Sequence, residues 1–435
     1  MGHMEIAAIL LTILFISLAM GLWVSLALLL MAVSGYWLID NSQWGNITAT
    51  ISWGSIADWK LAPLPMFIWM GEILFRSGLS KNLFDGLSVW LNRIPGKLFH
   101  VNTLSCGIFA AVSGSSAATV ATVGNITLPQ LKRLGYRESF AIGGLGGSGT
   151  LGLLIPPSIM MIIYGVAAEV SVSRLFMAGV LPGILLIVLF MGYTAVYCWL
   201  NPEAVPQEAS ENAQDNKVKA TLKLLPVVLL IIAVLGSIYT GLASPIEASG
   251  LGVLGALVLT RIEGSLDFAT FCEGLMAAVR TTAMLLFIIV TASVLTNAMG
   301  FIGLPRALAN VVADMDLSLG MLIVMLTLLF IVLGCFLDGI SVILLTTATI
   351  LPMVQAAGID PLWFGIYLVL VVEMSQITPP VGFNLFVLQS LTGRDLLQIA
   401  RYTLPFFLLM MLAIVLLWFF PEIATWLPTT MTEAQ

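Results

Sequence analysis

Apolar residues fill long runs along this chain, and polar residues are confined to short stretches between the runs. About twenty apolar residues in a helix cross the roughly 30 Å hydrocarbon core of a bilayer, so the pattern predicts an all-α polytopic membrane protein. Residues 1–3, ahead of the first run, resemble a cloning remnant. The runs lie near residues 4–20, 22–39, 59–75, 98–112, 136–170, 175–200, 222–240, 247–260, 274–298, 317–335, 361–392 and 396–420.

One long hydrophilic stretch, 201–220, separates two halves of similar length, 4–200 and 221–435. Such a linker invites a search for an internal repeat. A shift of 223 residues, the difference between Pro156 and Pro379, brings several helix-breaking residues into register. The matched positions are Leu128-Pro129 with Leu351-Pro352, Gly135 with Gly358, and Pro156-Pro157 with Pro379-Pro380. This register favours a duplication over the chance recurrence of helix breakers in membrane helices.

Charge indicates that the two copies have opposite orientations. Basic residues flank the first copy, namely Arg76, Lys81, Arg93, Lys97, Lys132, Arg133 and Arg137. Acidic residues flank the second copy, namely Asp314, Asp316 and Asp360. Cytoplasmic loops are enriched in Lys and Arg. Of the 17 Lys and Arg residues, all but Lys60, Arg174 and Arg306 then fall on the cytoplasmic side. The linker becomes cytoplasmic, and both termini become periplasmic.

On this topology, segments 98–133 and 317–355 each begin and end on one side of the membrane. We therefore expect two re-entrant hairpins, the first opening inward and the second outward. Each is followed by a broken helix, 136–170 or 361–392, interrupted by a proline pair. Non-helical backbone at this depth must be buried in protein or line a watery cavity.

Two shorter segments, 83–95 and 302–313, each place apolar residues on one helical face. Helices lying in the membrane interface, one in each leaflet, account for them. Short connecting helices packed on the core account for them equally well.

Composition excludes several classes of protein. Of the residues, 59% are hydrophobic and 9% charged, which leaves no room for a large soluble domain beside the lipid-embedded part. The net charge is −6 and no basic cluster points to nucleic acid. The four cysteines show no metal-site spacing, and His100 is the sole histidine outside residues 1–3. We expect no cofactor.

Polar residues gather at the two hairpin tips and at the two helix breaks. The first tip, 113–119, goes with the break 146–150, and the second tip, 334–341, with the break 373–378. Unwound carbonyls and hydroxyls suit a dehydrated sodium ion, whereas half-helix N-termini attract anions. Asp338 and Glu373 are ionisable groups within apolar segments, which marks them as functional. Capping of the half-helices is the structural alternative.

Residues 144–149, GLGGSG, match the G-x-G-x-x-G pattern of dinucleotide-binding turns. Such a turn opens an unbroken helix, whereas Pro156-Pro157 follows here within two turns. No G-x-x-x-x-G-K-[ST] sequence is present, so no nucleotide is required. A membrane oxidoreductase is thus an alternative with little support.

Four stretches together resemble the large membrane subunit of tripartite ATP-independent periplasmic (TRAP) transporters. They are SGSSAATVATVGNITLP from residue 113, GYRESFAIGGLGGSGTLGLLIPPSIMMIIYG from 135, LDGISVILLTTATILP from 337 and QITPPVGFNLFVL from 376. The resemblance implies a bacterial inner-membrane secondary transporter with an inverted repeat and an elevator-type mechanism. It also implies a small membrane subunit of about four helices and a soluble periplasmic binding protein as partners.

The resemblance further implies sodium as the coupling ion and assigns residues to sites. The first sodium site would comprise Ser113, Ser116, Gly147 and Thr150. The second would comprise Gly334, Asp338 and Gly339 with Glu373, Met374 or Thr378. Substrate candidates are Ser115, Asn125 and Asn384. No arginine is evident to pair a substrate carboxylate, so we expect helix dipoles and hydroxyls to hold the anion.

Sodium-coupled uptake of an organic acid is therefore the predicted function, with sialic acid favoured over a C4-dicarboxylate. The same hairpin architecture would serve a dicarboxylate or citrate symporter or antiporter that works without a binding protein. Transport by the reconstituted protein without a binding protein would favour that alternative.

Overall fold

The computed structural model describes residues 2–206, 217–307, 310, 318–380 and 382–433. Every element within these ranges is a helix, as the apolar runs predict. Five of the helices are long and apolar enough to cross a membrane, and up to seven spans result if each of two bent helix pairs counts as one. The other apolar helices are shorter, as the arms of hairpins and the halves of broken crossings would be.

The first half carries the elements up to the linker. They are α1 (His3–Ala19), α2 (Val24–Leu38), α3 (Trp44–Ile56), η1 (Trp59–Leu61), α4 (Pro63–Arg76), α5 (Leu79–Leu91), α6 (Leu98–Ser113), α7 (Ser116–Arg133), α8 (Glu138–Gly149), α9 (Leu151–Leu154), α10 (Ile159–Ala167), α11 (Val172–Leu200) and η2 (Pro202–Ala204). Residues 207–216 of the predicted linker lie outside the described residues.

The second half carries the remaining helices. They are α12 (Lys217–Tyr239), α13 (Pro245–Glu263), α14 (Phe268–Ile302), α16 (Leu319–Gly334), α17 (Gly339–Ala356), α18 (Pro361–Ser375), α19 (Phe383–Thr392), α20 (Leu396–Phe419) and α21 (Glu422–Glu433).

Capping residues and glycines set the helix ends. Ser115 caps α7, and Asp338 caps α17. Gly135 and Gly358 follow α7 and α17 with φ of +78° and +82°, a left-handed conformation that glycine adopts without steric cost. In both pairs the second residue lies 223 positions after the first, which is the spacing of the predicted repeat. The start and the end of these two helices therefore recur at that spacing.

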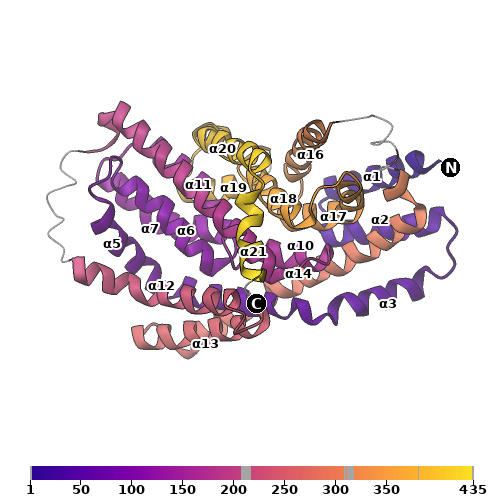
Figure 1. Ribbon diagram of the computed structural model, residues 1–435, viewed down its shortest axis with the longest axis horizontal. Helices are drawn as coiled ribbons and strands as arrows, with labels where there is room; N and C mark the ends of the chain where they lie inside the picture. The colour runs from indigo at the N-terminus through magenta and orange to yellow at the C-terminus, as the bar shows by residue number, and fades with distance from the viewer. Residues whose placement is uncertain (1, 207–216, 308–309, 311–317, 381, 434–435) are drawn as a thin grey trace.

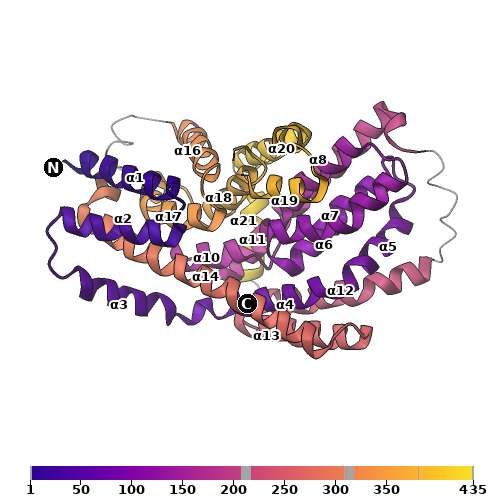
Figure 2. The ribbon, with the colours of Figure 1, turned by 180° about the vertical axis from the view of Figure 1, so that it is seen from behind.

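The molecule is elongated in both ribbon views, and helices from the two halves interleave along it (Figures 1 and 2). At one end α2 packs on α14, and α14 continues onto α4. At the other end α5, α6 and α7 lie together, with α12 and α13 along the lower edge in Figure 1. Helices α8 and α18 form the centre: the residues from Phe140 to Gly149 and from Leu362 to Ser375 are all buried.

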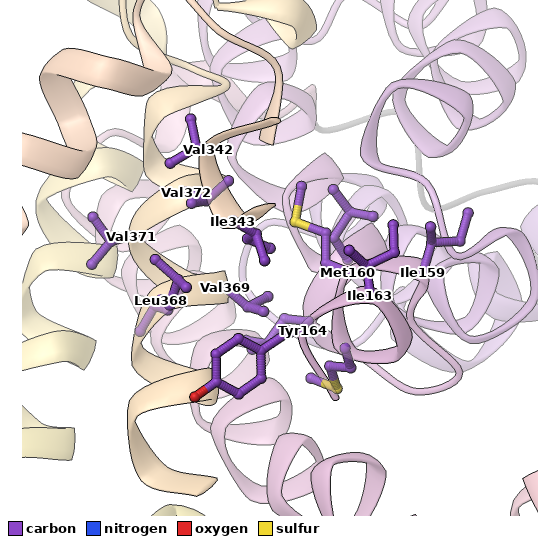
Figure 3. Packing of buried hydrophobic residues seen from close by; sticks show 14 of the residues in the cluster. Ile159, Met160, Ile163, Tyr164, Val342, Ile343, Leu368, Val369, Val371 and Val372 are labelled. Atoms are coloured by element: carbon purple, nitrogen blue, oxygen red, sulfur yellow. The ribbon is translucent and has the colours of Figure 1, made fainter. Parts of the chain in front are cut away.

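The two halves share one apolar core at this centre. Figure 3 shows Met160, Ile163 and Tyr164 of α10 facing side chains of α17 and α18. The Tyr164 hydroxyl also donates a hydrogen bond of 2.7 Å to the carbonyl of Pro361, where α18 begins. A helix of the first half is thus fixed against the hairpin and the crossing of the second.

The predicted helix at 83–95 corresponds to α5. Its residues Phe84, Leu87 and Leu91 are buried with Val101 of α6, so its apolar face packs on protein, as the connecting-helix alternative expects. The matching segment 302–313 includes positions outside the described residues.

Candidate functional site

The first hairpin tip lies between α6 and α7. Gly114 turns the chain with φ +57°, and Ser115 accepts a 3.4 Å hydrogen bond from the amide of Ala118. The hydroxyl of Ser113 lies 2.8 Å from that of Thr119, so it contacts its own hairpin rather than the broken crossing.

The tip packs directly on the broken crossing, which consists of α8, α9 and α10 and bends by 43°. A Cβ atom on Gly152 would lie 2.7 Å from the carbonyl oxygen of Ser115, so only glycine permits this approach. Nearby, the Ser116 hydroxyl donates a 3.1 Å hydrogen bond to the carbonyl of Gly149. Sequence reasoning assigned no role to the Gly149 carbonyl, because its glycine run does not reveal which carbonyl faces the hairpin.

The other two residues of the first predicted sodium site face elsewhere. Thr150 donates a 2.6 Å hydrogen bond to the carbonyl of Gly147, and its hydroxyl lies 3.6 Å from the sulfur of Met410 in α20. A Cβ on Gly147 would meet Phe406 of α20 at 2.4 Å. The structure thus brings Ser116 to the crossing and directs Gly147 and the Thr150 hydroxyl toward α20.

The second hairpin tip has a charged cap. Asp338 accepts hydrogen bonds of 3.1 and 3.2 Å from the amides of Ile340 and Ser341, and a further one from the Ser341 hydroxyl. Gly334 packs on Ser375, and Gly339 packs on Met160 and Val372, so closely that a Cβ on either would overlap them. These two glycines therefore allow the tip to pack closely against the centre of the molecule.

Glu373 of α18 is fully buried, and neither of its carboxylate oxygens has a hydrogen-bond partner among the residues that the structure describes. The Ser116 hydroxyl lies close enough to interact with this carboxylate, although the two form no regular hydrogen bond. Asn384 of α19 donates a 2.6 Å hydrogen bond to Ser116 through Nδ2, while its buried Oδ1 has no partner in the described part of the chain. We call Ser116, the Gly149 carbonyl, Glu373 and Asn384 the central cluster.

The remaining predicted residues lie around this cluster or away from it. Thr378 donates a 2.8 Å hydrogen bond to the carbonyl of Met374, whose side chain is buried. Asn125 is exposed along α7. The helix-breaking pairs follow the two crossing helices: Pro156-Pro157 lies between α9 and α10, and Pro379-Pro380 lies between α18 and α19.

A cavity of about 1110 Å³ lies between the two hairpin tips and the helices α2, α4 and α14. Ser115 and Ser116 of the first tip and Asp338 of the second line it, so the central cluster meets the cavity at Ser116. Arg280 of α14 lines it too. Sequence reasoning found no arginine for this region. The sequence feature that could have indicated this arginine is that it is the single cation inside the apolar run 274–298.

The donor set of the central cluster determines its chemistry. It offers carboxylate, amide, hydroxyl and carbonyl oxygens, contributed by two helices of each half. Hard cations prefer such oxygen ligands, and a buried carboxylate without a partner is costly unless a cation or a proton compensates it.

Comparison with known proteins relates the chain to transporters. Residues 11–423 match the sequence model of the tripartite ATP-independent periplasmic transporter, DctM component. The C4-dicarboxylate TRAP transporter large permease protein DctM of Pseudomonas aeruginosa is 33% identical, over 85% of this chain and 86% of that protein. The sialic acid TRAP transporter large permease protein SiaM of Vibrio cholerae is 29% identical, over 94% and 95%.

The fold is also found in a solved structure. The YdaH transporter of Alcanivorax borkumensis superposes with a TM-score of 0.61 at 15% identity, over 88% of this chain and 90% of that one. At this identity the likeness concerns the fold alone.

Proposed function

This chain belongs to the DctM component family, the large membrane subunits of TRAP transporters, and we propose that it performs sodium-coupled uptake of an organic acid. It is a multi-pass protein of the bacterial inner membrane. Large subunits of this family work with a small membrane subunit and a periplasmic binding protein. We propose that the small partner has about four helices and that the binding protein delivers the substrate.

The observation that carries sodium coupling is the Glu373 carboxylate, buried with both oxygens unpaired beside Ser116. A dehydrated sodium ion in the central cluster would neutralise this charge and accept the Gly149 carbonyl and the Asn384 Oδ1 as further ligands. Because these groups come from both halves, the ion would hold the first hairpin tip against the second crossing. An ion bound there would thereby complete the cavity wall at Ser116.

We further propose that the two halves form an inverted repeat whose hairpins and crossings move together as an elevator. The recurrence of caps and proline pairs at one spacing supports the repeat. The packing of α10 on α17 and α18 supports a unit built from both halves. In this mechanism α2, α4 and α14 belong to the part that stays in place.

Reconstitution tests the proposal directly. The protein, its small membrane subunit and its binding protein would be studied in proteoliposomes with labelled N-acetylneuraminate or succinate. We expect accumulation with an inward sodium gradient and none when choline replaces sodium. Equal accumulation in sodium and choline would contradict sodium coupling. Uptake that persists without the binding protein would instead favour a self-sufficient symporter or antiporter.

A further inference from the structure

Arg280 is a cation in the wall of the central cavity. It lies within α14, in the apolar run 274–298, and its side chain is exposed to the cavity. Next to it on this helix Thr281 also lines the cavity, and the cavity residues further along α14, from Ala283 to Ile288, are apolar. A charged side chain in such a segment is costly, and it usually marks a pathway for a substrate or an ion.

Arg280 also differs from the other charged residues of the cavity in having no partner among the described residues. Glu72 forms an ion pair with Arg76 of the same helix, and Asp338 accepts hydrogen bonds from its own hairpin. Within the part of the chain that the structure describes, Arg280 forms no hydrogen bond and no ion pair. Its five N–H donors are therefore available to a ligand.

A second part of the cavity wall also suits an anion. The N-termini of α7 and α17 meet the cavity at Ser115 and Asp338, and each helix has 18 residues. Helix N-termini carry partial positive charge and free amides, although Asp338 offsets this at α17. An anion in the cavity would thus be attracted both by Arg280 and by the tip of α7.

We propose that Arg280 binds the carboxylate of the transported anion, an assignment that rests on the proposed transport function. The planar guanidinium donates two parallel hydrogen bonds to a carboxylate, whereas lysine offers only a point charge. Arg280 would therefore select carboxylates among small polar solutes. It would hold them beside Ser116, where the central cluster meets the cavity.

Chemical protection of the arginine tests this assignment without requiring transport or sodium coupling. The complex of the large and small subunits would be treated with phenylglyoxal, and modification of each arginine would be followed by peptide mass spectrometry. We expect N-acetylneuraminate or succinate to slow modification of Arg280 severalfold, and the neutral N-acetylmannosamine to have no effect. Arg174, which is exposed at the start of α11 outside the cavity, should react equally throughout. Equal modification of Arg280 with and without both carboxylates would overturn the assignment.

Two variants provide the functional measurement. Arg280→Gln should raise the KM for uptake about tenfold or more, as expected for the loss of a charged hydrogen bond, with a smaller effect on kcat. Arg280→Lys should be intermediate, and Arg174→Gln should match the wild type. If Arg280 only reaches toward the membrane interface, Arg280→Lys will transport normally, and that result would also overturn the assignment. Lack of uptake by the wild type would count against the proposed function, whereas the protection experiment would still test Arg280.

Discussion

Gly152 is the residue at which the first hairpin tip touches the broken crossing. A Cβ there would lie 2.7 Å from the Ser115 carbonyl oxygen and 2.8 Å from the Cα of Ser116, and neither backbone atom can move aside independently. Gly152→Ala should therefore displace the tip and disrupt the central cluster. We expect uptake to fall about tenfold or more, while the protein still inserts and purifies as a folded complex.

Gly192 of α11 provides the matched control, because a Cβ there would meet nothing within 4 Å. Alanine also favours a helix over glycine by about 1 kcal/mol. Gly192→Ala should leave uptake unchanged and raise the thermal unfolding temperature slightly. If Gly152→Ala transports as well as Gly192→Ala, the close approach of the tip is not needed for transport.

Sequence reasoning identified residues of the central cluster but not their grouping. It placed Ser116, Glu373 and Asn384 in three different sites, whereas the structure joins them around the Ser116 hydroxyl. The residue types are recognisable because polar groups in apolar segments stand out. Their grouping depends on which face of α18 and α19 turns toward α7, and this is set by packing between the halves rather than by local pattern.

Among the helices, α17 begins at Asp338, whose side chain could act as a helix cap or as a negative charge. All its observed contacts are those of an N-cap on α17. Asparagine caps helices about as well as aspartate, whereas alanine costs about 1 kcal/mol. We therefore expect Asp338→Asn to keep uptake and thermal stability near wild type, and Asp338→Ala to lower both. Loss of uptake in Asp338→Asn without loss of stability would show that the negative charge itself is used, for example to bind a cation.

The ends of helices were predictable where the sequence contains a capping residue or a proline pair. The tips near Ser115 and Asp338 and the breaks at the proline pairs lie where helices end in the structure. The location of α5 was less predictable. An amphipathic helix can pack equally well on a membrane interface or on protein. The burial of α5 against α6 depends on tertiary packing, which the local sequence pattern does not reveal.

At the scale of the whole molecule, the two halves meet in a shared core and in the central cluster. The apolar runs predicted the membrane class correctly, and the spacing of prolines and glycines predicted a repeat, which stays a prediction. The cavity could not be predicted, because it depends on how α4 and α14 stand against both hairpin tips. The role proposed for Arg280 became visible only with that cavity.

In the proposed mechanism, a sodium ion bound at Glu373 couples the two halves to transport. The most direct measurement is the sodium concentration that half-activates uptake in proteoliposomes, compared between the wild type, Glu373→Gln and Glu263→Gln. Glu263 is a matched control because its carboxylate, partly buried at the end of α13, pairs with Asn82 outside the cluster. We predict that Glu373→Gln raises this concentration about tenfold or more, because the charged ligand is lost, and that Glu263→Gln leaves it unchanged. An unchanged sodium dependence in an active Glu373→Gln protein would contradict sodium binding at Glu373.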